Sequence, residues 1–250
     1  MVVGYEGFRQ WFQGYEDQFV VIGGAACDIM MSEVGADFRG TKDIDMVLLV
    51  ESLTADFGRR FWMYVTEGGY QHKNKSRGQP QFYRFTNPAK PGFPVMIELF
   101  SRRADAIELP ANAVLTPLPL DDDLSSLSAI LMDDDYYSFL RAGKTVIDGI
   151  PILDAAHLIP LKAKAWLDLS ARKAAGEPVD SRHIRKHKSD VFRLSGVISP
   201  NAKVEASVTI IADLTAFCTA MQAEEVDLKS LGLSGRKDDI LDKIMDTYLA

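Results

Sequence analysis

The stretch that decides the fold reads Phe19-Val20-Val21-Ile22-Gly23-Gly24-Ala25, and Thr41-Lys42-Asp43-Ile44-Asp45 follows it. An apolar run that enters a glycine pair and continues into a helix-forming run predicts a strand, a tight turn and a helix. Because glycine has no Cβ, a phosphate can approach the backbone and the free N–H groups of the first helical turn. We therefore expect a phosphate-binding turn between a strand over 18–22 and a helix over 25–34.

Asp43 and Asp45 stand two residues apart at the start of an apolar run. Side chains alternate along a strand, so both carboxylates are expected on the same face. Two adjacent acids repel unless a cation lies between them or water surrounds both. Glu98 is the single charge in a later apolar run, and a buried acid there needs a partner. That partner is either a metal ion shared with the two aspartates or an arginine such as Arg84.

The remaining pattern predicts an α/β core over residues 1–153 and a helical region over 154–250. A polar, basic segment over 72–78 predicts a loop, and the glycine pair 68–69 is expected to end the helix before it. The other expected elements are helices over 5–15, 54–67 with Thr54 as N-cap, 136–141, 155–175, 180–195, 202–223 and 236–249, and strands over 43–51, 81–86, 94–101 and 145–153, the last broken at 148–149.

Composition narrows the class of protein. The chain has 250 residues, 47% of them hydrophobic, which is enough to bury a sizeable core. Its net charge of −7 creates no global positive field, so nucleic acid would need a local patch such as the basic run 182–193. Cys27 and Cys218 are too few for a disulfide framework and indicate a reducing compartment. With no signal-peptide pattern and no apolar run of membrane-spanning length, we expect a cytoplasmic protein without a membrane partner.

Three stretches resemble the polymerase-β-like nucleotidyltransferase superfamily and, within it, the AbiEii/AbiGii-type toxin nucleotidyltransferases. The first is 21–45, with the glycine pair and the Asp-x-Asp motif, and the second is Ile97-Glu98-Leu99. The third is the helical segment 160–165 together with Lys188-Ser189-Asp190-Val191. The resemblance spans most of residues 19–195. It implies a nucleotidyltransferase-fold mixed sheet flanked by helices, in the α/β (α+β) class, with a helical C-terminal region.

The same resemblance implies an enzyme that moves a nucleoside monophosphate from a nucleoside triphosphate (NTP) to an acceptor hydroxyl on RNA or protein, with Mg²⁺ or Mn²⁺ as cofactor. It also implies a toxin of a toxin–antitoxin pair, with a cognate antitoxin as partner. The implied catalytic and metal-binding residues are Asp43, Asp45 and Glu98. The implied nucleotide-binding residues are Gly23, Gly24, Thr41, Lys42, Lys162 and Lys164, of which Lys162 is the first choice for the triphosphate.

Several alternatives stay open at this point. Lys162 and Lys164 also fit a solvated stripe beside a core face of their helix. The basic run 182–193 equally fits a helix face in water. For the chain as a whole, one alternative is a catalytically silent nucleotide- or partner-binding module. Another is a nucleotidyltransferase that modifies a small molecule such as an antibiotic, with an acidic pocket for a cationic drug.

Overall fold

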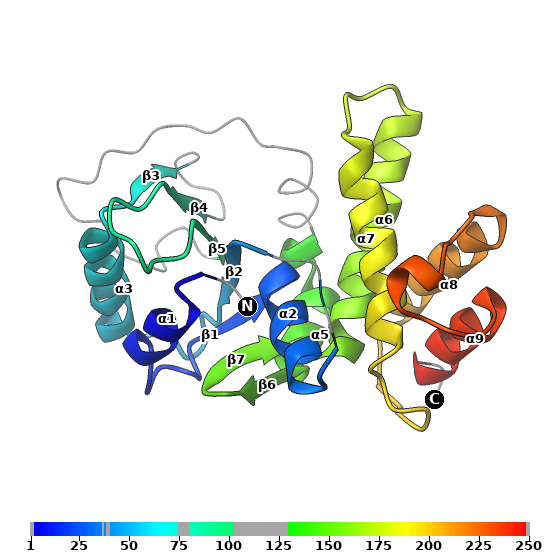
Figure 1. Cartoon of the computed structure of the whole chain (residues 1–250), viewed down its shortest axis with the longest axis horizontal. Helices are drawn as coiled ribbons and strands as arrows, with labels where there is room; N and C mark the ends of the chain where they lie inside the picture. Colours follow the sequence, from blue (N-terminus) through cyan, green and yellow to red (C-terminus); the bar gives the residue numbers. More distant parts are fainter. Residues whose placement is uncertain (1–2, 37, 39–40, 75–80, 103–129, 249–250) are drawn as a thin grey trace. The chain divides into compact units, whose positions relative to one another are not determined.

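The computed structural model describes residues 3–36, 38, 41–74, 81–102 and 130–248, which form two compact units (Figure 1). The first unit comprises Met1–Pro119 and Lys144–Asp154, and the second comprises Leu120–Gly143 and Ala155–Ala250. The helix at 134–142 therefore belongs to the second unit, whereas its sequence position lies within the expected α/β core. Across the described ranges, no helix combines the length and the apolar character that a membrane span requires.

A mixed sheet organises the first unit. Its strands are β1 (Phe19–Ile22), β2 (Asp43–Leu48), β3 (Gln71–Asn74), β4 (Gln81–Thr86), β5 (Met96–Ser101), β6 (Lys144–Ile147) and β7 (Ile150–Leu153). Their order is β3-β4-β5-β2-β1-β7-β6, with β1–β7 and β2–β5 parallel and the other neighbouring pairs antiparallel. Together with its flanking helices and the helical C-terminal region, this confirms the predicted α+β class.

The edge strand β3 corrects one prediction. A loop was expected over 72–78, but residues 71–74 pair with β4 in an antiparallel ladder. The backbone of β4 supplies the hydrogen bonds that hold this polar segment as a strand, and a local sequence pattern carries no signal of such a partner. The remainder of the expected loop, 75–78, lies outside the described residues.

The helices of the first unit are α1 (Tyr5–Trp11), α2 (Gly23–Glu33) and α3 (Ala55–Gly68). Two expected helix boundaries are confirmed: the Thr54 hydroxyl accepts from the Phe57 N–H at 3.2 Å, and α3 ends at Gly68, with Gly69 as its C-cap at a φ of 65°. In contrast, α2 begins at Gly23 rather than at Ala25, so the glycine pair itself forms its first turn.

These helices pack on one face of the sheet. Ile44 of β2 lines a small apolar space together with Tyr5 of α1 and Ala25 of α2. On the same face, the Phe85 ring of β4 contacts the Phe61 ring of α3, with centroids 5.3 Å apart. The two aspartates of β2 alternate with Ile44, so they lie on the opposite face of the sheet.

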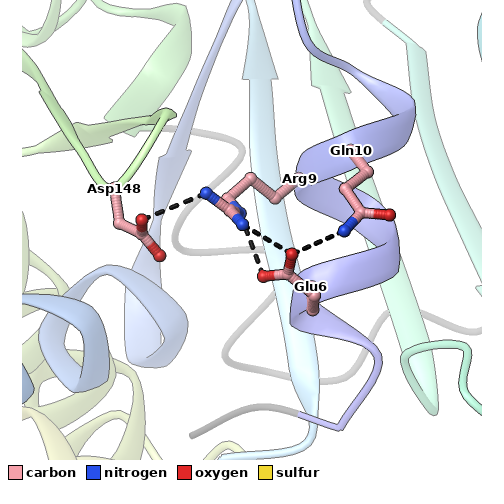
Figure 2. A network of polar contacts seen from close by, with 4 residues as sticks. All are labelled: Glu6, Arg9, Gln10 and Asp148. Carbon is pink, nitrogen blue, oxygen red and sulfur yellow. Dashed lines mark hydrogen bonds and ion pairs between the residues drawn. The ribbon is translucent and has the colours of Figure 1, made fainter.

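Helix α1 is fastened to the turn between β6 and β7 (Figure 2). Arg9 lies between two acids: its Nη1 donates to Asp148 at 3.1 Å and its Nε donates to Glu6 at 3.0 Å. Asp148 and Gly149 both have positive φ, 47° and 73°, which is typical of a two-residue hairpin turn and confirms the predicted break. Because water reaches both side chains and screens their charges, the contact orients α1 more than it stabilises the fold.

The second unit is helical. It contains α5 (Asp134–Ala142), α6 (Ala155–Ala174), α7 (Ser181–Ser195), α8 (Val208–Ala223), a 3₁₀ turn (Lys229–Leu231) and α9 (Lys237–Tyr248). Helix α8 begins six residues later than expected at 202, because the Ser207 hydroxyl caps it by accepting from the Ile210 N–H. The segment before it is extended, and the Val204 N–H donates to the Thr247 carbonyl of α9.

Lysines of α9 cap the C-terminal ends of two other helices. Lys237 donates to three carbonyl oxygens at the end of α8, at 2.7–3.0 Å. Lys243 donates to the carbonyls of Ser195 and Ile198, at and just beyond the end of α7. The last carbonyls of a helix have no N–H partner within the helix, and a cation also complements the negative end of its dipole. These lysines therefore bind α9 to α7 and α8.

Pro160 lies inside α6 and is accommodated by the last turn of α9. Proline has no N–H, so the Ala156 carbonyl four residues earlier loses its helical donor. The hydroxyl of the buried Tyr248 donates to that carbonyl instead. The polar group released by the proline is thereby satisfied from a different helix.

Replacing Tyr248 with phenylalanine is expected to lower the free energy of unfolding by about 1 kcal/mol, because the Ala156 carbonyl loses its donor. Tyr5→Phe is the matched control. Tyr5 is 5% exposed, and its hydroxyl has no hydrogen-bond partner among the described residues. Removing that hydroxyl should leave stability unchanged or slightly higher. Urea unfolding of both variants tests the assignment, which equal losses would contradict.

Candidate active site

The strand register brings three charged residues into a row across the sheet. Arg84 of β4 pairs with Glu98 of β5, and Glu98 pairs with Asp45 of β2. Asp45 in turn pairs with Ile22, the last residue of β1 before the glycine pair. Residues opposite one another on neighbouring strands share a face, so the three charged side chains lie next to each other. Two of the three predicted acids are thus brought together.

Glu98 has a partner on each side. On one side, Arg84 Nε donates to Glu98 Oε1 at 2.6 Å, and Arg84 Nη2 lies 2.5 Å from the same oxygen. The Glu98 side chain is 9% exposed and the Arg84 side chain 16%. On the other side, the Glu98 carboxyl hydrogen-bonds with Asp45. The arginine considered from the sequence as a partner of Glu98 is therefore present, and it coexists with the acid contact.

Burial raises the pKa of Glu98, and the neighbouring Asp45 carboxylate raises it further; Arg84 lowers it, but by less. Two carboxyl groups in contact hold one shared proton more readily than two negative charges. A divalent cation in place of that proton would pair with both charges at once. The Asp45–Glu98 pair therefore has the electrostatic character of a cation site.

Gly23 is required by the position of Asp45. A Cβ at residue 23 would collide with Asp45 Oδ2 and would lie 2.9 Å from Asp45 Cγ. Gly23 also has a φ of 69°, which disfavours any residue with a side chain. The N-cap residue Ile22 makes no side-chain hydrogen bond to the first turn of α2, and the N–H groups of a first helical turn are suited to bind an anion. The Asp45 carboxyl thus lies against the first turn of α2.

The third acid, Asp43, is half-buried on β2 and pairs in register with Met96. Within the described part of the chain, no three Asp, Glu, His or Cys side chains lie close enough to enclose a metal ion. Asp43 therefore completes no three-acid cage with Asp45 and Glu98, and its role as a ligand stays a prediction. Magnesium needs no such cage, because it commonly binds one or two carboxylates, waters and substrate phosphates. The donor chemistry of the Asp45–Glu98 pair fits that mode.

Two of the residues expected to bind nucleotide directly precede β2. Thr41 is half-buried and Lys42 is exposed. The Lys42 carbonyl accepts from the Val95 N–H at 3.2 Å, which extends the pairing of β2 with the approach to β5. Contacts of Thr41, Lys42 and Gly24 with a nucleotide stay predictions.

Both lysines of α6 make ion pairs within the second unit. Lys162 is 6% exposed, so the solvated-stripe alternative is wrong for it, and its Nζ lies 3.4 Å from Oδ2 of the buried Asp190. Lys164 donates to Asp213 at 3.1 Å and lies 3.6 Å from Asp168. Burial lowers the pKa of Lys164, but these carboxylates outweigh it and raise the pKa overall. Binding of a triphosphate by either lysine stays a prediction.

No family model and no curated protein matches the sequence. Three solved structures are similar to this chain at a distant level. An antigenic nucleotidyltransferase-like protein from Paracoccidioides brasiliensis has 14% identity and a TM-score of 0.46, with 95% of this chain and 94% of that chain covered. A proposed nucleotidyltransferase from H. pylori has 12% identity and a TM-score of 0.33, with 98% of this chain and 91% of that chain covered. The nucleotidyltransferase toxin MenT4 from Mycobacterium tuberculosis H37Rv has 12% identity and a TM-score of 0.31, with 99% of this chain and 82% of that chain covered. Similarities this distant do not assign the chain to a family.

The raised pKa of Glu98 makes a testable contribution to stability. An acid whose pKa is raised on folding stabilises the protein fully below its usual pKa of 4.5, and that stability is lost as the pH rises towards the raised value. The free energy of unfolding of the wild type should therefore fall with increasing pH relative to that of Glu98→Gln, which cannot ionise. Urea unfolding of both proteins at several pH values above 4.5, without divalent ions, measures this difference. Parallel pH profiles would show that Glu98 is already ionised in the folded protein.

Proposed function

We propose that this protein is a Mg²⁺-dependent nucleotidyltransferase, which moves a nucleoside monophosphate from an NTP to an acceptor hydroxyl. One observation carries the proposal: the Asp45 side chain lies against Gly23 at the N-terminus of α2 on one side and next to the Glu98 carboxyl on the other. Oxygen ligands for a hard cation next to backbone donors for phosphate are what a metal–triphosphate complex requires.

The reaction follows from these groups. The acceptor oxygen attacks the α-phosphorus and forms a new P–O bond, while the bond to the β-phosphate oxygen breaks and pyrophosphate leaves. The backbone N–H groups at Gly23 and Gly24 hold the β- and γ-phosphates in place. Asp45, with Asp43, would hold the cation, which would supply positive charge to offset the charge developing on the phosphates. Glu98, once ionised, would accept the proton of the acceptor hydroxyl.

We further propose RNA or protein as the acceptor and a toxin role with a cognate antitoxin, on the strength of the motif resemblance described above. The net charge of −7 gives RNA no long-range attraction, so an RNA acceptor would need local contacts. Expression of the wild type should arrest growth of a bacterial host, whereas expression of Asp43→Asn should not. Unimpaired growth of the culture that expresses the wild type would contradict the toxin role. The transfer activity would then be judged from the labelling experiment.

The direct test supplies each of the four α-labelled NTPs and Mg²⁺ to the protein, with total RNA and lysate protein as acceptors. Label should appear in RNA or in a protein band, and chelation of Mg²⁺ or the Asp43→Asn substitution should abolish it. Label in a small molecule would identify the antibiotic-modifying alternative. Metal-dependent NTP binding without any transfer would support the binding-module alternative. Normal transfer by Asp43→Asn would exclude Asp43 from the site, and normal transfer by Asp45→Asn as well would place the site elsewhere.

A further inference from the structure

Arg84 is the charged residue of the site that the proposed reaction does not use. It comes from β4, on the side of Glu98 away from Asp45. Both Nε and Nη2 make their close contacts with the same oxygen, Glu98 Oε1. A guanidinium more often spans both oxygens of a carboxylate, one nitrogen to each. Here the two nitrogens converge on one oxygen.

This geometry restricts how Glu98 can meet a cation. Oε1 is held by two nitrogens of Arg84 on one side of the carboxyl, while the contact with Asp45 is on the other side. The side chain is also buried, so it has little room to rotate. Because Arg84 holds Oε1, Glu98 cannot chelate an ion with both oxygens while Arg84 stays in place.

We propose that Arg84 is a specificity-determining residue, which makes the Asp45–Glu98 site select Mg²⁺ over Ca²⁺ by occupying one oxygen of Glu98. This inference rests on the cation site of the proposed function. Calcium takes six to eight oxygens at about 2.3–2.6 Å and commonly uses carboxylates that bind through both oxygens. Magnesium takes six ligands at about 2.0–2.1 Å and binds carboxylates through single oxygens. A glutamate restricted to one oxygen disfavours the larger ion.

The experiment measures the dissociation constants of Mg²⁺ and Ca²⁺ separately, by calorimetry on the full chain without nucleotide. Arg84→Met removes the guanidinium and releases Oε1. Arg84→Lys keeps the charge but offers a single nitrogen. Arg59→Met is the matched control, because Arg59 also pairs with an acid but is 69% exposed on α3. Circular dichroism and urea unfolding establish that each variant is folded.

In Arg84→Met, the preference for Ca²⁺ relative to Mg²⁺ should increase roughly tenfold, the scale of effect seen for groups that orient metal ligands. Arg84→Lys should shift the ratio less and in the same direction, and it carries the test if Arg84→Met does not fold. Arg59→Met should leave the ratio unchanged. A purely structural role for Arg84 would weaken both ions by the same factor, and an unchanged ratio overturns the inference. Absence of any divalent-ion binding by the wild type, both alone and with an NTP present, would instead refute the cation site of the proposed function, and the inference with it.

Discussion

Asp45→Asn is expected to lower the rate of nucleotidyl transfer by roughly 10³-fold, the upper range for losing one group that stabilises charge in the transition state. A neutral amide oxygen is a weaker ligand for Mg²⁺ than a carboxylate oxygen. The amide also leaves Glu98 as the only negative charge of the contacting pair. Single-turnover transfer from an α-labelled NTP measures the loss, with Asp56→Asn on the exposed start of α3 as control.

The same substitution should leave the free energy of unfolding unchanged or increase it. Asp45 and Glu98 raise each other's energy when both are ionised, and an amide at position 45 removes that repulsion and can donate to the Glu98 carboxylate. Loss of activity together with retained or higher stability is typical of a residue kept for function rather than for folding. A variant that loses stability and activity together would indicate that Asp45 serves the fold.

Gly23→Ala is expected to cost several kcal/mol of stability and to abolish transfer. The new methyl group would collide with Asp45 Oδ2, and the φ of 69° adds about 1–2 kcal/mol for any residue with a Cβ. Gly14→Ala separates the two causes. Gly14 has a φ of 89°, and a Cβ there would meet nothing within 4 Å, so this control carries only the backbone cost.

Combining Gly23→Ala with Asp45→Ala should recover part of the lost stability, since the colliding oxygen is gone. Thermal unfolding of the two single variants and the double variant provides the comparison. Simple addition of the two single effects would show that the side chain of residue 45 does not occupy the space beside residue 23.

Much of the secondary structure of the first unit could be predicted, because side-chain alternation and helix caps are patterns within a few consecutive residues. Alternation places Asp43 and Asp45 on one face of β2, and a cap such as Thr54 acts within a single turn of helix. The contact of Asp45 with Glu98 was proposed from chemistry, as acids that need a shared partner. Its actual cause is the parallel register of β2 and β5, which no local pattern reveals.

The misses have the same origin. The glycine pair was expected before α2 and forms its first turn, because the left-handed Gly23 makes room for Asp45 on a neighbouring strand. For Lys162 the solvated-stripe alternative was wrong, because the structure buries it against Asp190 of another helix; Lys164 pairs with Asp213, and triphosphate binding by either lysine stays a prediction. Helix packing decides such partners, and it depends on contacts far apart in the sequence.

The α9 lysines that cap α7 and α8 contribute less to the positive charge of the second unit's surface than their number suggests. A cation that donates to helix carbonyls is already neutralised by a dipole, so counting Lys237 and Lys243 among the basic residues overstates the attraction for a polyanion. A nucleic acid that recruited them would have to uncap two helices. That cost would be subtracted from the free energy of binding, so heparin or RNA should bind these two lysines weakly and raise the melting temperature less than it would at a preformed binding surface.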